Sequence, residues 1–339
     1  MMIIVRQPGM LTTRQDHGWQ NMLHLSLSRG GAMDPDALAT ANQLVGNPLD
    51  ACGLEFTGMG PTLFFPQALC LAWTGGMMQA TMTVANKAKA IAVSLPSHRP
   101  VVVPAGATVR WGACLAGFRC WLAVAGGIEA PSLLASRSSH LAAVIGGTPL
   151  RKDDQLTVGS PSNHAQRIQS VIGSMTDKLS WSVSTTVPAL WPVMEIAALP
   201  GRHFSRLSEE DQKRLLEQIW TVSSSSNRQG LSLSGERLST TLPSILSEPV
   251  REGTVQLPPS GQPIVLLAEH QSTGGYPRVL EILSTERERL AQAGPSARIL
   301  FRLVSLEQAD RLRASRQRAQ DALRDSIAGK LSSLCGPLI

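Results

Sequence analysis

The sequence predicts a mainly β fold with a few helices, an α+β chain whose strands close into barrels or sandwiches. Apolar residues mostly form short, strand-sized runs that Gly and Pro interrupt. Few segments repeat apolar residues with helical spacing, so the regular strand–helix alternation of a parallel sheet is missing. At 339 residues the chain is long enough for two domains of ordinary size or one large one.

The first half is predicted to contain many strands and one clear helix. Asp34 is suited to cap this helix, Pro35 fits its first turn, and Gly46 ends it. The predicted strands cover residues 2–5, 63–65, 69–73, 90–95, 101–103, 108–111 and 119–124.

A polar stretch separates the two halves. Residues 160–190 are rich in Ser, Asn, Gln and Thr, which indicates a poorly packed connection. Beyond it, residues 208–220 predict a helix that Ser208 caps. Further strands are predicted at 193–198, 231–233, 254–257 and 264–268. We therefore expect a β domain over 1–165, a linker over 166–190, a second β domain over 191–305, and a basic amphipathic helix and tail over 306–339.

The net charge of +6 owes much to the C-terminal segment, where arginines outnumber acidic residues. Apolar residues keep roughly helical spacing there, so we interpret the arginines as the solvated face of an amphipathic helix. Aromatic residues make up only 4% of the chain and none interleaves with these arginines. The stacking surface of a single-strand binder is therefore missing, and no nucleic-acid partner is expected.

Cysteine usage and hydropathy favour a soluble protein of a reducing compartment. The five cysteines follow no CxxC or Cys/His spacing, which argues against a disulfide framework and a metal site. No run of about 18 apolar residues is present, and the one before Arg6 is too short for a signal peptide. We expect a cytoplasmic protein with no membrane segment.

Familiar nucleotide and cofactor motifs are absent. The chain has no GxxxxGK(S/T) loop, no GxGxxG after a strand, no HExxH and no GxSxG. A lysine-centred biotin-attachment motif is missing as well. The chain by itself is therefore predicted to be neither an ATPase nor a biotin carrier.

The most informative stretch is GQPIVLLAEHQSTGGYP, at residues 261–277. A buried strand leads into His270 and Gln271, and Gly274 and Gly275 then let a ligand or another strand approach closely. Ordinary turn chemistry explains the same pattern.

Several short segments of the chain are informative when they are taken in order. They are PGMLTTRQDHG (8–18), GAMDP (31–35), ANQLVGNP (41–48), LEFTGMGPTLFF (54–65), LAVAGGI (122–128), SRS (136–138), SNRQGLSLSG (226–235), LSEP (246–249) and 253–277. Together they resemble the biotin-dependent carboxyltransferase family, and the resemblance covers roughly residues 3–305. This family includes the C subunit of 5-oxoprolinase, allophanate hydrolase subunit 2, the antagonist of the sporulation kinase inhibitor and the carboxyltransferase region of urea carboxylase.

The resemblance implies two tandem cyclophilin-like β-barrel domains and an enzyme completed by other chains. The implied partners are the cyclophilin-like B subunit and the A subunit of the same enzyme, and the implied reaction is ATP-dependent opening of 5-oxo-L-proline to L-glutamate. The chain alone would bind no cofactor, and the assembled complex would use ATP. Two alternatives stay open: a biotin-dependent carboxyltransferase component of the urea or allophanate type, and a non-catalytic regulator that binds a kinase-inhibitor-like partner.

Candidate site residues come from the matching segments. Opening an amide develops negative charge on an oxygen, so hydrogen-bond donors and a titratable base are needed. We assign His270, Gln271, Arg228 and Asn227 to catalysis. We assign Arg137, Tyr276, Gly274, Gly275, Asp16 and Glu55 to substrate binding.

Each assignment has a structural alternative. Asp16 is equally suited to close a turn at Gly18, and Asn227 with Arg228 to form a turn before Gly230. Arg137 fits a buried ion pair, and Glu55 either faces water or pairs inside the protein. His270 also departs from the family pattern, because relatives commonly have Arg before this Gln.

Overall fold

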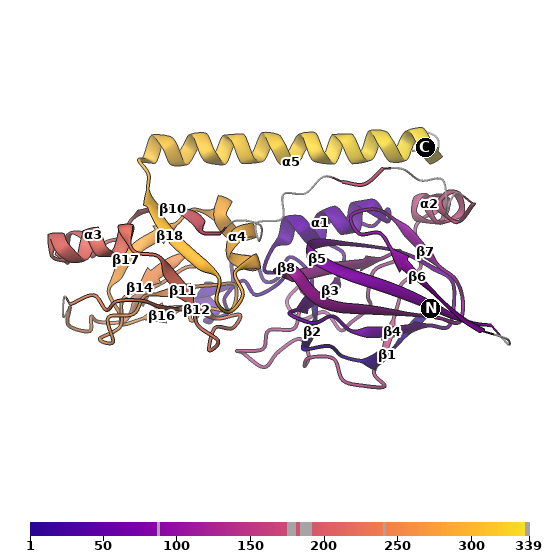
Figure 1. Ribbon diagram of the computed structural model, residues 1–339, viewed down its shortest axis with the longest axis horizontal. Coiled ribbons are helices and arrows are strands. Elements are labelled where there is room, and N and C mark those ends of the chain that lie inside the picture. Colours follow the sequence, from indigo (N-terminus) through magenta and orange to yellow (C-terminus); the bar gives the residue numbers. More distant parts are fainter. Residues whose placement is uncertain (87–88, 175–180, 184–191, 240–241, 336–339) are drawn as a thin grey trace.

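The computed structural model describes residues 1–86, 89–174, 181–183, 192–239 and 242–335. The chain forms two β units in sequence, and a long C-terminal helix spans both (Figure 1). The predicted mainly β fold with two units and a C-terminal helix is confirmed.

The N-terminal unit is a nine-stranded sheet with the order β2-β3-β8-β4-β1-β9, in which β5 also pairs with β6, β7 and β8. Its pairings, among the described residues, do not close a barrel. Two strands of 18 residues, β5 and β8, pair along much of their length and fold around a core that contains Trp73 and Trp111. The strands are β1 (Met2–Gln7), β2 (Leu11–Gln15), β3 (Gly53–Thr57), β4 (Thr62–Phe65), β5 (Leu69–Asn86), β6 (Lys89–Leu95), β7 (Val101–Val103), β8 (Ala107–Val124) and β9 (Gln155–Thr157).

The C-terminal unit is a closed barrel with the strand order β10-β17-β14-β15-β12-β11-β18. Its first and last strands, β10 and β18, run parallel to each other, and the remaining pairs are antiparallel. A separate two-stranded ribbon, β13 with β16, lies beside it. The strands are β10 (Met194–Pro200), β11 (Trp220–Val222), β12 (Gly230–Ser234), β13 (Glu248–Pro249), β14 (Thr254–Gln256), β15 (Ile264–Leu266), β16 (Thr273–Gly274), β17 (Arg278–Ile282) and β18 (Arg298–Leu303).

Helix starts follow the capping residues in the sequence. The Asp34 side chain accepts hydrogen bonds from the backbone N–H groups of Asp36 and Ala37, and the Ser208 side chain accepts one from Asp211. The helices are α1 (Pro35–Leu44), α2 (Asn163–Ser174), α3 (Glu209–Glu217), α4 (Arg287–Gln292) and α5 (Leu306–Cys335), with short 3-10 turns at η1 (Leu23–Leu25), η3 (Phe204–Arg206) and η4 (Ser284–Glu286).

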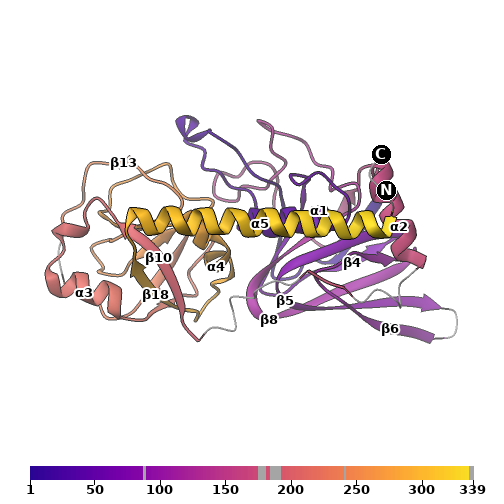
Figure 2. The ribbon, with the colours of Figure 1, turned by 90° about the horizontal axis from the view of Figure 1, so that it is seen from above.

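The long helix α5 leaves the barrel after β18 and runs along the molecule to α2 (Figures 1 and 2). Only its far end is well buried, through Ile327, Leu331 and Cys335, which join a small core with α1 and α2. Leu306 at the other end is 72% exposed. No described helix is long and apolar enough to cross a membrane.

The structure corrects several sequence-based boundaries. The predicted strands at 108–111 and 119–124 are parts of one strand, β8, and β5 extends far beyond residue 73. The stretch interpreted as a poorly packed connection begins with α2, which buries Ala165, Ile168 and Ile172. Its apolar residues recur at spacings of three and four among polar ones, so the polar composition concealed an amphipathic helix. The rest of the predicted linker falls mostly outside the described residues.

Candidate functional site

A buried ion network joins the two units at Arg228, just before β12. Its Nε donates to Glu269 Oε1 at 2.5 Å, its Nη1 donates to Glu55 Oε1, and its Nη2 donates to Gly31 O at 2.5 Å. Arg228 is 3% exposed, and Glu55 and Glu269 are 1% exposed. The guanidinium therefore links β3 of the N-terminal unit to the end of the β15 segment in the barrel.

The network continues around Glu55. Its Oε2 accepts from Met33 N and from Trp121 Nε1, both at 2.8 Å, while Arg119 Nε lies 3.8 Å from Oε1. Burial alone would lower the pKa of Arg228, but Glu55 and Glu269 outweigh it and raise that pKa. Burial lowers the pKa of Arg119 to about 10, against the attraction of Glu55. We call Glu55, Arg119, Arg228 and Glu269 the inter-unit network.

Ser28 and His140 extend this network. With Glu269 they lie in the order of the nucleophile, base and carboxylate of a catalytic triad. Ser28 Oγ lies 2.9 Å from His140 Nε2, and His140 Nδ1 lies 3.7 Å from Glu269 Oε2. However, Nδ1 accepts a hydrogen bond from Ala143 N, so the proton sits on Nε2 and is donated to Ser28. Burial lowers the pKa of His140 and keeps the ring neutral, and Ser28 is 2% exposed. The arrangement therefore supports the fold and is not built for nucleophilic attack.

Asp16 organises the loop that contains Arg137. Its Oδ1 accepts from Ser136 Oγ at 2.7 Å, Ser138 Oγ at 2.5 Å and Gly18 N at 2.8 Å, and its Oδ2 accepts from Arg137 N at 2.6 Å. The expected turn at Gly18 is present, and the Arg137 side chain is exposed rather than in a buried ion pair. Both carboxylate oxygens of Asp16 therefore bind this loop and hold it against the end of β2.

Beside Asp16, the structure leaves polar atoms without partners. Arg14 Nε, Ser139 Oγ and Gln15 Oε1 are buried and have no hydrogen bond within the described part of the chain. A Cβ at Gly147 would overlap Arg14 Nη2 and would lie 3.6 Å from Ser139 Oγ, so the guanidinium and the hydroxyl are near neighbours. A guanidinium with an unpaired Nε next to an unpaired hydroxyl is a suitable receptor for a carboxylate. The sequence pointed to Arg137 and missed Arg14, because only the fold shows that the buried Arg14 Nε has no acceptor among the described residues.

The strand-end motif lies in the barrel unit. His270 Nδ1 donates to Gln271 O at 2.6 Å, which leaves Nε2 as the acceptor of the neutral ring. Burial lowers the pKa of His270, although the Gln271 carbonyl and Glu252 act in the opposite direction. Gln271 Nε2 donates to Gln256 Oε1 at 3.0 Å. His270 is therefore held as a neutral, oriented imidazole, which is the form required of a general base.

The glycine pair makes room for another strand. Gly274 in β16 pairs with Glu248 in β13, and a Cβ at Gly274 would overlap Gln256 Nε2. Neither Gly274 nor Gly275 has a positive φ, so close packing rather than backbone conformation requires glycine at 274. Tyr276 beside them is 40% exposed.

The structure brings only some of the candidate residues into contact. Arg228 and Glu55 form one buried ion pair, and Asp16 binds the backbone of Arg137, whereas Asn227 closes the expected turn by accepting from Gln229 N at 2.7 Å. Sequence reasoning missed Glu269 and Arg119 as partners of Arg228 and Glu55. A buried Arg requires carboxylates, but the sequence does not show which ones.

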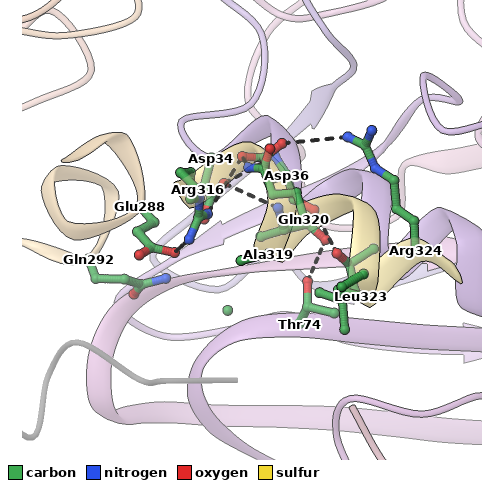
Figure 3. A pocket seen from close by; sticks show the side chains of 14 residues that line it. Asp34, Asp36, Thr74, Glu288, Gln292, Arg316, Ala319, Gln320, Leu323 and Arg324 are labelled. Carbon is green, nitrogen blue, oxygen red and sulfur yellow. Dashed lines mark hydrogen bonds and ion pairs between the residues drawn. The ribbon is translucent and has the colours of Figure 1, made fainter. Parts of the chain in front are cut away.

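A second polar region lies under α5, where a cavity of about 460 Å³ separates this helix from α1 and α4. Figure 3 shows Arg316 of α5 reaching toward Glu288 and Asp36, with Asp34 beside them. Gln292 also lines the cavity, and its Oε1 accepts from Arg119 N at 3.0 Å. None of the candidate residues assigned from the sequence lies in this cavity.

Comparison with known proteins identifies the family. Residues 25–303 match the family described as the carboxyltransferase domain, subdomain A and B. The chain is 34% identical over 321 residues to the C subunit of 5-oxoprolinase from Escherichia coli K12, and the match covers 94% of this chain and 96% of that protein.

Two solved structures share the fold. The crystal structure of TTHA0988 aligns with a TM-score of 0.73 at 30% identity, over 89% of this chain and 55% of that chain. The Kluyveromyces lactis urea carboxylase structure aligns with a TM-score of 0.78 at 22% identity, over 95% of this chain and 29% of that chain. This chain therefore spans about half of the first protein and less than a third of the second. The fold, the order of the motifs and the match over most of the sequence show that the chain belongs to the carboxyltransferase domain family of subdomains A and B.

Proposed function

We propose that this chain is the C subunit of an ATP-dependent 5-oxoprolinase, which opens 5-oxo-L-proline to L-glutamate together with the A and B subunits in the cytoplasm. One observation carries the proposal: the identity to the C subunit of 5-oxoprolinase extends over nearly the whole of both chains. The name of the relative describes one component of a larger enzyme, so the chain is expected to have no activity alone.

The reaction sets the chemical requirements of the site. Water adds to the ring carbonyl, the ring C–N bond breaks, and the released nitrogen takes up a proton. A base must accept a proton from water, and donors must stabilise the negative oxygen that forms. In this proposal the neutral His270 is the base, and Gln271 and Tyr276 of the same motif orient the amide. The ATP is used by the assembled complex, and this chain binds no cofactor by itself.

The carboxylate of 5-oxoproline needs a cationic receptor, and Arg14 supports that role best. Its buried Nε has no partner among the described residues, and the unpaired Ser139 hydroxyl lies close by. Arg137, which is exposed on the neighbouring loop, is free to add a second positive charge. Arg228 is a weaker choice because each of its nitrogens already binds a protein oxygen.

Reconstitution tests the proposal. The chain is co-purified with the A and B subunits, and glutamate formation and ATP hydrolysis are measured with 5-oxoproline. Activity that requires all three chains supports the assignment. Activity of the other two chains without this one, or none with all three, would sink it.

Substitution of Arg14 tests the carboxylate receptor. Arg14→Gln is expected to raise the KM for 5-oxoproline by about 10-fold to 100-fold, because a hydrogen bond to a charged group contributes about 1.5–3 kcal/mol. Arg110→Gln, on the exposed surface of β8, is the matched control and should leave the KM unchanged. An Arg14→Gln enzyme with an unaltered KM would remove Arg14 from the site.

The second candidate is a biotin-dependent carboxyltransferase component, which the description of the matching family favours. The same reconstituted sample decides between the two. A carboxyl transfer that requires biotin and is inhibited by avidin supports this alternative, whereas turnover of 5-oxoproline that avidin does not affect excludes it.

A further inference from the structure

Two cysteines of β8 lie against the same glycine of β5. The Cys120 thiol donates to Gly76 O at 3.0 Å, and a Cβ at Gly76 would lie only 2.7 Å from Cys114 Sγ. The Cys114 thiol donates to Ala116 O at 3.2 Å, and the two thiols are close enough to form a hydrogen bond with each other. The missing side chain of Gly76 thus leaves the space in which both sulfur atoms meet.

An irregular stretch of β8 brings these two cysteines together. The pairing of β5 with β8 shifts register on both sides of Met77, so β8 has extra residues here and bulges. Gly117, within the bulge, has a φ of 85°, a conformation that favours glycine. A disulfide needs Cα atoms about 4.4–6.8 Å apart, so its formation depends on small adjustments of the backbone. A bulge that contains a glycine can supply them.

Cys114 is the more reactive member of the pair. It is half-buried, whereas Cys52, Cys70, Cys120 and Cys335 are buried. The hydrogen bond with Cys120 lowers the pKa of Cys114, because the Cys120 thiol can turn to donate to the thiolate. Burial instead raises the pKa of Cys52 and of Cys70 to about 12. Since the thiolate is the nucleophile, Cys114 has the exposure and the ionisation that oxidation requires, and Cys120 is the adjacent second thiol.

We propose that Cys114 and Cys120 are a reversible oxidation site, which hydrogen peroxide converts to an intramolecular disulfide. The Cys114 thiolate attacks one peroxide oxygen, the O–O bond breaks, and the departing hydroxide takes up a proton to become water. Cys114 is then a sulfenic acid. The Cys120 sulfur attacks the sulfenic sulfur, the S–S bond forms, the S–O bond breaks, and the hydroxyl leaves with the Cys120 proton as a second water. Two electrons pass from the thiol pair to the peroxide, and a dithiol reductant returns them.

This oxidation site lies at the junction between the two units. Phe118 and Arg119, which lie between the two cysteines in the sequence, donate their backbone N–H groups to Gln292 Oε1 at 2.7 Å and 3.0 Å. Arg119 Nη1 also donates to Ala291 O at 2.7 Å. The disulfide therefore closes a loop around the residues that hold α4. In a reducing compartment the pair remains as thiols until peroxide is present.

Peptide mapping of the full-length chain tests the proposal. The reduced chain is treated with micromolar hydrogen peroxide, quenched with catalase, alkylated in denaturant and digested with trypsin. Cleavage after Arg119 separates the two cysteines, so their disulfide holds fragments 111–119 and 120–137 together until dithiothreitol is added. The expected result is this linked pair, with the other cysteines alkylated. Linkage of other cysteines, oxidation of Cys114 without linkage, or no oxidation of Cys114 would overturn the proposal.

Two single variants test the order of the steps. Cys120→Ser keeps a hydrogen-bond donor but cannot form the disulfide, so the sulfenic acid at Cys114 persists and is labelled by dimedone. Cys114→Ser leaves only the buried thiol, and labelling of Cys120 is expected to be at least about 10-fold lower. Cys52→Ala is the matched control and should form the disulfide like the parent chain. Equal labelling of the two variants would contradict the roles of the two cysteines. The assay needs no enzyme activity, so its outcome is independent of the proposed function.

Discussion

Two buried charged regions lie on either side of the start of α1, and they differ in how their charges are compensated. In the inter-unit network, Glu55 and Glu269 face Arg228 and Arg119. Around the cavity under α5, three carboxylates, Asp34, Asp36 and Glu288, face two guanidiniums, Arg316 and Arg324, so negative charges outnumber positive ones. Met33 connects the regions, because its N–H donates to Glu55 and Asp34 follows it.

The difference is one of charge balance. Burying an ion pair is tolerable when the partners satisfy each other, as Arg228 does with Glu55 and Glu269. Burial, followed by repulsion from Asp36, raises the pKa of Asp34 to about 7, although Arg316 acts in the opposite direction. Asp34 is therefore costly to ionise.

Removing Arg228 should have the largest effect. Arg228→Met leaves Glu269 without an arginine and Glu55 with only Arg119, 3.8 Å away, and is expected to lower the free energy of unfolding by about 3–5 kcal/mol, measured by urea denaturation. Arg202→Ala is the control, since Arg202 is 69% exposed in its pair with Glu248 and should cost at most about 1 kcal/mol. If the two variants lose the same free energy of unfolding, the inter-unit network does not join the units.

The pH dependence of stability tests the region around Asp34. The Asp34 pKa is raised from 3.8 to about 7 on folding, so the native state binds more protons in this window and stability falls as the pH rises through it. A shift of roughly three pKa units corresponds to about 4 kcal/mol. Asp34→Asn should remove this contribution, gaining stability relative to the parent between pH 5 and pH 8. A parallel pH profile for both proteins, in urea melts, would show that folding does not raise the pKa of Asp34.

Substituting Gly274 tests the packing of the strand-end motif. A Cβ there overlaps Gln256 Nε2, the end of a flexible but buried side chain. Gly274→Ala is therefore expected to cost about 1–3 kcal/mol in thermal or urea unfolding. Stability equal to that of the parent would show that Gln256 moves aside freely, and that the glycine is needed for something other than packing.

The smallest change should be a gain in stability in α5. Gly329 is exposed, and nothing lies within 4 Å of the Cβ it lacks. Gly329→Ala should stabilise the helix by about 0.5–1 kcal/mol, seen as a higher unfolding midpoint. An unchanged midpoint would show that unfolding of α5 is not coupled to that of the two units.

Local signals in the sequence were sufficient for many elements. Asp34 and Ser208 marked the starts of α1 and α3, because an N-cap acts within one turn. The apolar run before His270 correctly indicated β15. Long strands were less predictable: β5 and β8 contain glycines and polar residues that resemble turns, and pairing with each other and with neighbouring strands keeps them extended. Polar composition likewise concealed α2.

The candidate site was predictable in residue type but not in arrangement. The sequence singled out Glu55 and Arg228 without showing that they pair, and it favoured Arg137 over Arg14. Partners separated by 173 residues, as these two are, meet only after both units have folded and docked. The motif order alone identified the family, and that identification now rests on the match to residues 25–303 as well.

By itself the sequence determined the mainly β fold, the helix starts, the C-terminal helix and the family, since these depend on the pattern of neighbouring residues. Only the tertiary structure decided which charges are neutralised. Arg228 and Asp34 both lie in motif-like segments, yet each nitrogen of Arg228 binds a protein oxygen, whereas Asp34 lies among more carboxylates than guanidiniums. Charge compensation depends on distances of a few ångströms between groups far apart in the chain, and folding alone sets those distances.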